Sequence, residues 1–240
     1  MKTKVAIVFA QPSPYRVDLI AHMQKKYQNY EFCFFYGEKV NTREWDIEFD
    51  KLQKSVEVPL KALCWKGRTD QRIKVYASKV DRFLDEFNPN VIIASEYNAL
   101  SLDSLRWARK YKVPFISWTD GTPHSERNIS IIQKMQRRYV FKRARSFIAS
   151  SIKSKELQMK YGAKEENIFI STLTVDVDKY LCNHVTNSVP IFVFVGALVK
   201  RKGLDLLINA LKKIRDEAFI LRVVGSGDER DSLMKQVKAQ

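Results

Sequence analysis

Short apolar segments alternate with longer segments of helical periodicity along most of the chain. The runs VAIVFA, VIIAS and PFISW are too short for helices and are apolar on both faces. Parallel strands that are covered by helices on two sides show this pattern. It predicts strands at 5–10, 31–36, 91–95, 114–118, 146–149 and 169–170, and helices at 16–26, 73–87, 100–111 and from Ser150 or Ser151 to Gly162. We therefore expect an α/β chain with a doubly wound parallel sheet.

A second unit of the same kind begins near residue 190. The chain loses its periodicity in YLCNHVTNSVP, and a new apolar strand follows at 191–195. A helix at 204–214, a strand at 219–224, a glycine loop and another helix complete one βαβ unit and start the next. This organisation predicts one domain at 1–182 and another at 183–240. A complete doubly wound domain usually has about 100–150 residues, so we expect the chain to stop inside its second domain.

Composition and charge narrow the possible partners. Hydrophobic residues make up 45% of the chain, charged residues 29%, and the net charge is +15. Such a charge attracts nucleic acid, anionic lipid and phosphorylated small molecules alike. No apolar run approaches the roughly 20 residues of a membrane-spanning helix, and the first run is too short for a signal peptide. Cysteines stand at positions 33, 64 and 182 without metal-ligand spacing, which favours a reducing compartment and no disulfide framework.

A cationic turn follows the first strand of the second unit, in VGALVKRKGLDLL. In a βαβ unit this loop lies at the carboxyl edge of the sheet, where ligands of open α/β sheets bind. Gly196 allows the backbone to approach a ligand closely, and Lys202 stands where a helix begins and its N–H groups favour an anion. The turn therefore suits a phosphate group. A solvated turn of Lys200, Arg201 and Lys202 is the competing interpretation.

Four segments resemble the retaining nucleotide-sugar glycosyltransferases of glycosyltransferase family 4. VGALVKRKGLDLLINAL with FILRVVGSGDERDSL resembles the donor-binding half, and YGAKEENIFISTLTVDVDKY resembles the segment that closes the first domain. PSPYRVDLI is similar to the first acceptor-side loop, and ISWTDGT to the strand and loop that bear a central active-site residue. The resemblance implies the GT-B fold, with two Rossmann-like domains of which the second is incomplete here. It also implies sugar transfer from a nucleotide diphosphate donor to a glycan or lipid-linked acceptor at the cytoplasmic membrane face, without metal or cofactor.

Site residues follow from the resemblance position by position. Lys202-Gly203 matches the family's diphosphate-binding lysine-glycine, whereas Ala197 stands where the family has an arginine, for which Arg201 is a possible substitute. Donor binding is thus expected at Gly196, Arg201 and Lys202. Asp120 replaces a histidine near the transferred sugar and becomes the candidate catalytic residue. An Asp-Gly turn is the alternative at that position, and His124 is a second candidate.

The resemblance also implies acceptor-binding residues near the N-terminus and two glutamates further along the second domain. Ser13, Tyr15 and Arg16 are the candidate acceptor-binding residues, although Tyr15 could instead pack against the start of the helix. The family's two glutamates, seven residues apart, would lie further along the second domain than residue 240. A non-catalytic remnant or binding module of the same fold, which needs a partner or a missing C-terminal segment, is therefore the alternative to an active enzyme.

A basic amphipathic helix is predicted between residues 129 and 145. The basic residues of this helix are expected on one face, with Phe141 among them. Another face is expected to carry the apolar residues Ile132, Met135, Tyr139 and Val140. Five cations, each contributing about 1 kcal/mol near an anionic leaflet, favour reversible membrane binding over a merely solvated face. No zinc-finger, RNA-binding or helix-turn-helix pattern supports nucleic acid as the partner. The predicted membrane-binding residues are Lys134, Arg137, Arg138, Lys142 and Arg145.

Overall fold

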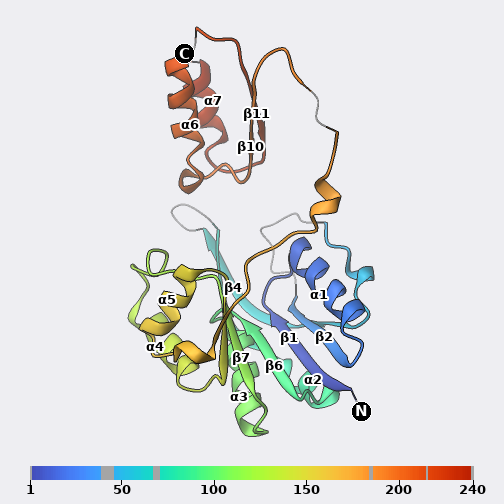
Figure 1. Cartoon of the computed structure of the whole chain (residues 1–240). Helices are drawn as coiled ribbons and strands as arrows, with labels where there is room; N and C mark the ends of the chain where they lie inside the picture. The colour runs from blue at the N-terminus through green and yellow to red at the C-terminus, as the bar shows by residue number, and fades with distance from the viewer. Residues whose placement is uncertain (1, 39–45, 67–70, 184–185, 215, 239–240) are drawn as a thin grey trace. The chain divides into compact units, whose positions relative to one another are not determined.

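The computed structural model describes residues 2–38, 46–66, 71–183, 186–214 and 216–238, with the backbone only for 62–66 and 71–76. The chain divides into two compact units. The first comprises Met1–Leu63 and Ile73–Tyr180, and the second comprises Cys64–Arg72 and Leu181–Gln240. The helices and strands of both units carry the labels of Figure 1.

Seven parallel strands form the sheet of the first unit, in the order β3-β2-β1-β6-β7-β8-β9. From β1 the chain adds β2 and β3 on one side and then adds β6 to β9 on the other. The direction of winding therefore changes between β1 and β6, and ligands of open α/β sheets bind at such a switch point. The predicted doubly wound parallel sheet is thereby confirmed. The strands are β1 (Thr3–Phe9), β2 (Tyr30–Gly37), β3 (Ser55–Val58), β6 (Val91–Ser95), β7 (Phe115–Thr119), β8 (Ser146–Ala149) and β9 (Ile168–Ile170).

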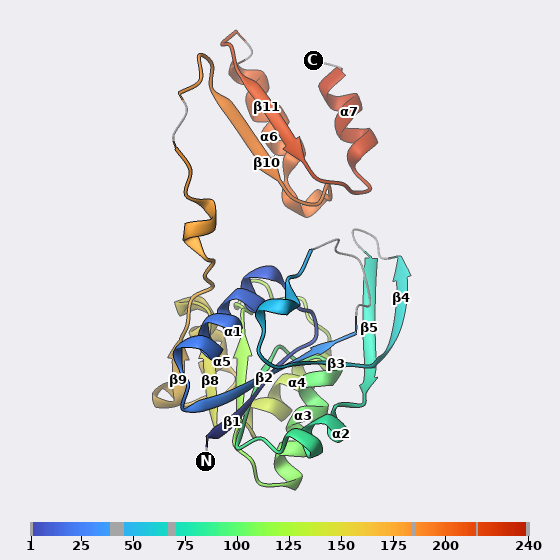
Figure 2. The ribbon, with the colours of Figure 1, turned by 90° about the vertical axis from the view of Figure 1, so that its right-hand side faces the viewer.

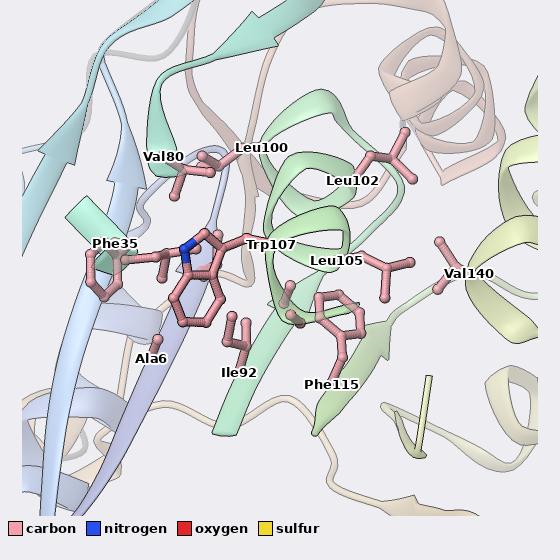
Figure 3. Packing of buried hydrophobic residues seen from close by; sticks show 14 of the residues in the cluster. Ala6, Phe35, Val80, Ile92, Leu100, Leu102, Leu105, Trp107, Phe115 and Val140 are labelled. Carbon is pink, nitrogen blue, oxygen red and sulfur yellow. The ribbon is translucent and has the colours of Figure 1, made fainter. Parts of the chain in front are cut away.

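Helices cover both faces of this sheet. They are α1 (Pro14–Lys26), α2 (Val80–Phe87), α3 (Ala99–Lys110), α4 (Ile131–Phe141) and α5 (Ile152–Lys160), with 3₁₀ turns at Phe49–Lys51, Glu165–Asn167 and Val177–Tyr180. Val17 and Ile20 of α1 pack with alternate residues of β1 on one face. Ala6 and Val8 of β1 face a larger core with α2, α3 and α4. In this core Trp107 lies among aliphatic and aromatic side chains (Figure 3) and donates its indole N–H to Asp85 at 2.8 Å.

The predicted helix at 73–87 is wrong in its first half. Residues Gln71–Ser78 form strand β5, which pairs with β4 (Leu60–Lys66) in a separate two-stranded sheet, visible in Figure 2. The segment RIKVYAS alternates polar and apolar residues, which is the strand period. Only α2 keeps helical spacing, with Val80, Leu84 and Phe87 buried on one side. Strand β3 was also absent from the predicted elements.

The second unit contains a two-stranded parallel sheet of β10 (Ile191–Val195) and β11 (Ile220–Val224). Its helices are α6 (Leu204–Leu211) and α7 (Arg230–Lys238), with 3₁₀ turns at Lys200–Lys202 and Lys212–Ile214, and Figure 1 shows both helices on one side of the sheet. Their small core contains Leu198, Leu204, Ile208 and Leu233. The opposite face of the sheet is apolar and exposed, since Val193, Val195 and Val224 are 61%, 74% and 58% exposed.

Candidate functional site

The carboxyl edge of the first sheet brings together residues from three strand exits. Arg16, in the first turn of α1, lies with its Nη2 3.4 Å from both carboxylate oxygens of Asp120, which directly follows β7. Its guanidinium also lies over the rings of Trp118, at 4.3 Å, and Phe9, at 4.8 Å. Arg16 is only 4% exposed, whereas the Asp120 side chain is 39% exposed. The buried cation therefore holds a carboxylate that still reaches solvent, and the catalytic role of Asp120 stays a prediction.

Glu96, which follows β6, is a residue of this edge that the sequence reasoning missed. Its carboxylate accepts the Asp120 backbone N–H at 3.0 Å and the Thr119 hydroxyl at 3.3 Å. Burial raises the pKa of the Glu96 carboxyl above its ordinary value of 4.5, and the bond from Asp120 opposes that shift. A signal was present in the sequence, because an acidic residue directly follows a buried strand beside the switch point.

The other acceptor-side candidates surround Arg16. Ser13 occupies the N-cap position of α1, but its hydroxyl makes no capping bond. Its Oγ is buried without a hydrogen-bond partner in the described part of the chain, as is Nε1 of Trp118. Tyr15 lies with its ring 5.4 Å from the Arg16 guanidinium. His124 lies in the exposed loop beyond Asp120, where its Nδ1 is 3.4 Å from Arg127. Polar groups are thus available at the start of α1.

Helix α4 departs from the predicted membrane-binding face at two positions. Arg137 is buried and bonds both carboxylate oxygens of Glu126 at 2.8 Å, with its guanidinium over the ring of Tyr97. Phe141 is also buried, stacked on Phe147 and Tyr161. The expectation that these two side chains face a membrane is therefore wrong. Their burial has a physical reason, because Glu126 neutralises the cation and the aromatic rings fill the core beneath the helix.

The outward face of α4 carries both cations and apolar side chains. Lys134, Arg138, Lys142 and Arg145 are exposed, as predicted. Ile132 and Met135 were expected on another face, but they are 68% and 63% exposed, and Ile131 is 76% exposed. The helix begins with a capping box in which Ser130 and Gln133 bond each other's backbone N–H groups. We call the surface formed by Ile131, Ile132, Lys134, Met135, Arg138 and Lys142 the α4 face.

In the second unit, glycines allow two strand exits to approach each other. A Cβ atom on Gly225, after β11, would collide with the carbonyl oxygen of Gly196, after β10. A Cβ atom on Gly227 would likewise collide with the Leu198 carbonyl. Leu198 N–H donates to the Ser226 carbonyl at 2.7 Å, which ties the two loops together. Glycine at positions 225 and 227 therefore allows the two loops to pack this closely, which any other residue would prevent.

The cationic turn continues the loop after β10 and leads into α6. Lys200 forms an ion pair with Asp205, and this hydrogen bond raises the pKa of the lysine. Lys202 is exposed and has no ion-pair partner among the residues that the structure describes. Gly203 is the N-cap of α6, with a left-handed φ of 69° that other residues adopt rarely. Lys202, rather than Lys200, is therefore available for an anion, while the donor-binding roles of Gly196, Arg201 and Lys202 stay predictions.

Solved structures share this architecture. The chain aligns with Alr3699/HepE of Anabaena in complex with UDP-glucose, with a TM-score of 0.68 and 14% identity over 98% of this chain and 65% of that chain. A glycosyltransferase from Rickettsia africae aligns with a TM-score of 0.63 and 16% identity, over 99% of this chain and 64% of that one. UDP-GlcNAc 2-epimerase from Methanocaldococcus jannaschii aligns with a TM-score of 0.56 and 12% identity, over 98% and 69%. These likenesses define a GT-B-type α/β fold.

Sequence comparison identifies the family. The model described as Glycosyltransferase Family 4 matches residues 15–179. The model described as Glycosyl transferases group 1 matches residues 183–240. The chain belongs to Glycosyltransferase Family 4, as its motifs indicated. It spans about two thirds of the length of the Anabaena and Rickettsia structures. A comparison with curated proteins finds no match.

Proposed function

We propose that the chain belongs to a retaining glycosyltransferase that moves a sugar from a nucleotide diphosphate donor to a glycan or lipid-linked acceptor, without metal or cofactor. The exits of β10 and β11 carry this proposal, because glycines hold the two loops close together and the loop after β10 continues into the exposed Lys202 at the start of α6. Family membership supports transfer over the epimerisation that the same fold accommodates elsewhere. Alr3699/HepE is crystallised with UDP and with UDP-glucose, which supports a nucleotide-sugar donor.

The donor site supplies only part of a diphosphate clamp. One exposed lysine and a few backbone N–H groups give roughly 4–5.5 kcal/mol, which corresponds to a Kd of about 0.1–1 mM. Lys202→Ala should remove about 1.5–3 kcal/mol, enough to make binding undetectable. Arg201→Ala should cost nearly as much if Arg201 replaces the family arginine, and almost nothing if its guanidinium points away from the phosphates.

Calorimetric titration with UDP and GDP at low salt tests this donor site. Lys213→Ala is the matched control, because Lys213 is an exposed lysine beyond the other end of α6. We expect the control to bind like the wild type and Lys202→Ala to lose binding. Undiminished binding by Lys202→Ala would contradict the proposed site.

The first unit would supply the acceptor side of the reaction. Asp120 would accept a hydrogen bond from a sugar hydroxyl or stabilise developing positive charge, while Arg16 keeps its carboxylate in place. The buried hydroxyl of Ser13 and the Tyr15 ring lie beside Arg16, which suits an acceptor sugar or its phosphate. A transfer assay should show Asp120→Asn slower by about 10²–10⁴-fold. Equal rates would remove Asp120 from the reaction.

The α4 face would place the enzyme at the cytoplasmic surface of an anionic membrane. No helix in the described part of the chain is long and apolar enough to cross a membrane. Three exposed apolar side chains in the first turns of α4, followed by Arg138 and Lys142, instead suit shallow insertion beside anionic headgroups. Each cation contributes about 1 kcal/mol, and a fully inserted isoleucine contributes about 1.5–3 kcal/mol.

Vesicle flotation separates the two contributions. Replacing Lys134, Arg138 and Lys142 by Gln should weaken binding to phosphatidylglycerol vesicles and reduce its salt dependence. Ile131→Ser with Ile132→Ser should weaken binding at every ionic strength. Ile152→Ser is the matched control, because Ile152 is 68% exposed at the start of α5. Equal loss from the control and from the α4 variants would exclude α4 as the membrane-binding surface.

A non-catalytic module that needs a partner is the second candidate function. The exposed valines on one face of β10 and β11 favour it, because parallel strands are normally covered on both faces and two strands alone are marginally stable. A polypeptide that covers this face, in the same chain or in another, would complete the unit. If UDP binds only when such a polypeptide is added, the result favours a module that needs a partner over a chain that binds the donor by itself.

A further inference from the structure

Glu96 has an unfavourable backbone conformation at the exit of β6. Its φ is +62°, a left-handed conformation that residues other than glycine, asparagine and aspartate rarely adopt. Such a conformation persists only where neighbouring groups hold it in place. The Glu96 N–H donates to the Trp118 carbonyl at 2.9 Å, which is one such contact. A glutamate at a position suited to glycine points to a use for its side chain.

The side chain reaches the exit of β7 and holds the backbone there. Its carboxylate accepts the Asp120 N–H at 3.0 Å and the Thr119 hydroxyl at 3.3 Å. Thr119 is fully buried, and its Oγ1 accepts the Gly121 N–H at 3.0 Å. Three successive residues, with Asp120 in the middle, are therefore connected to one carboxylate. To accept hydrogen bonds from both the Thr119 hydroxyl and the Asp120 N–H, the Glu96 carboxyl must present unprotonated oxygens to them.

These bonds determine where the Asp120 side chain lies. The Asp120 carboxylate meets Arg16, whose guanidinium is itself held over Trp118. With its amide held by Glu96 and its carboxylate by Arg16, Asp120 is fixed at both ends while its side chain stays 39% exposed. An aspartate in an exposed Asp-Gly turn would otherwise sample several conformations.

We propose that Glu96 is a positioning residue for Asp120, holding the exit of β7 so that the Asp120 carboxylate faces solvent at Arg16. This inference rests on the proposed function, in which Asp120 faces the transferred sugar. The preorganisation matters because a polar group that is held in place before the substrate arrives loses no further conformational freedom on binding.

Amide hydrogen exchange of the wild type, Glu96→Gly and Glu96→Gln tests the positioning role without any sugar. Glycine suits the backbone of residue 96, so a purely structural role predicts an unchanged or more stable loop. The positioning role instead predicts exchange at the Asp120 and Gly121 amides about tenfold to a hundredfold faster in Glu96→Gly. Amides of Val8 and Ile92, in the central strands, are the internal control and should be unchanged. Glu96→Gln retains one acceptor and should give a smaller increase.

Unchanged exchange at Asp120 and Gly121 in Glu96→Gly would overturn the inference. If Glu96→Gly accelerates exchange throughout the unit, Glu96→Gln decides: a local increase supports positioning, and a uniform increase overturns it. A second readout is the pKa of Glu96 measured by carbon NMR, which Thr119→Val should raise further by removing a hydrogen bond to the ionised carboxylate.

A sugar titration separates this inference from the proposed function. Methyl glucoside, added as the probe, should shift the Asp120 and Gly121 amide resonances of the wild type and shift them less in Glu96→Gly. An absence of shifts in the wild type would count against the sugar-facing role of Asp120. The exchange result would still decide the positioning role of Glu96.

Discussion

Replacing Arg137 by methionine should destabilise the first unit strongly, although its neighbour Arg138 can be replaced at little cost. The Arg137 and Glu126 side chains are 10% and 7% exposed, with Nη2 and Oε1 2.7 Å apart. Removing the cation leaves Glu126 with the Tyr161 hydroxyl, at 3.3 Å, as a weaker partner. Breaking a buried ion pair from one side costs about 3–5 kcal/mol.

This cost is large enough to measure directly. For a unit of this size each kcal/mol lowers Tm by about 2–4 °C, so Arg137→Met should lower it by about 6–20 °C. Urea unfolding, followed by tryptophan fluorescence, to which Trp107 and Trp118 of the first unit contribute, gives the free energy of unfolding. Arg138→Gln is the matched control, since Arg138 is exposed on the same helix and should change stability by no more than about 0.5 kcal/mol.

A second substitution tests the cause of the loss. Adding Glu126→Gln to Arg137→Met removes the unpaired buried charge and should recover part of the stability. If Arg137→Met costs no more stability than Arg138→Gln, the pair of Arg137 and Glu126 does not stabilise the first unit. Arg137 would then belong with the surface cations, as the sequence pattern indicated.

Three further predictions concern the domain boundary, Gly225 and pH. Limited proteolysis should cut first within 181–189, where the sequence is polar and lacks periodicity, and first cuts inside 5–36 would contradict a boundary there. Gly225→Ala should destabilise the second unit by at least about 1–3 kcal/mol in urea unfolding, because the added Cβ meets the Gly196 carbonyl. Gly162→Ala is the control: its φ is also positive but its Cβ has open space, so it should show the cost of backbone strain without a clash. Burial raises the pKa of Glu96 in the folded state, so the unfolded state loses this proton at a lower pH than the folded state. The free energy of unfolding should therefore decrease as pH rises above 4.5, and Glu96→Gln should abolish that decrease.

The strand pattern could be predicted because buried parallel strands are short and apolar on both faces. Val91–Ser95 and Ile191–Val195 have the predicted bounds. The segment that became β5 was harder, because its apolar residues run directly into those of α2 without a glycine or proline between them. Alternation in RIKVYAS was the signal that separates the two elements.

The orientation of α4 depends on tertiary contacts that the sequence does not display. Its apolar residues occur on several sides of the helix, so periodicity does not select one buried face. Phe141 fixes the rotation by stacking on Phe147, and Glu126 from the preceding loop makes the burial of Arg137 possible. Likewise, the positive φ of Glu96 and its bond to Asp120 depend on how the exits of β6 and β7 meet in three dimensions, which the sequence does not display.

A nucleotide diphosphate is proposed to bind where β10 and β11 end. Titration of the isotope-labelled chain with UDP, followed through its amide resonances, measures this binding residue by residue. We expect concentration-dependent shifts at Gly196, Lys202, Gly203, Gly225 and Gly227, with a dissociation constant of about 0.1–1 mM. They should disappear in Lys202→Ala. Shifts confined to the first unit, or none at these glycines at saturating UDP, would show that the diphosphate does not bind at the ends of β10 and β11.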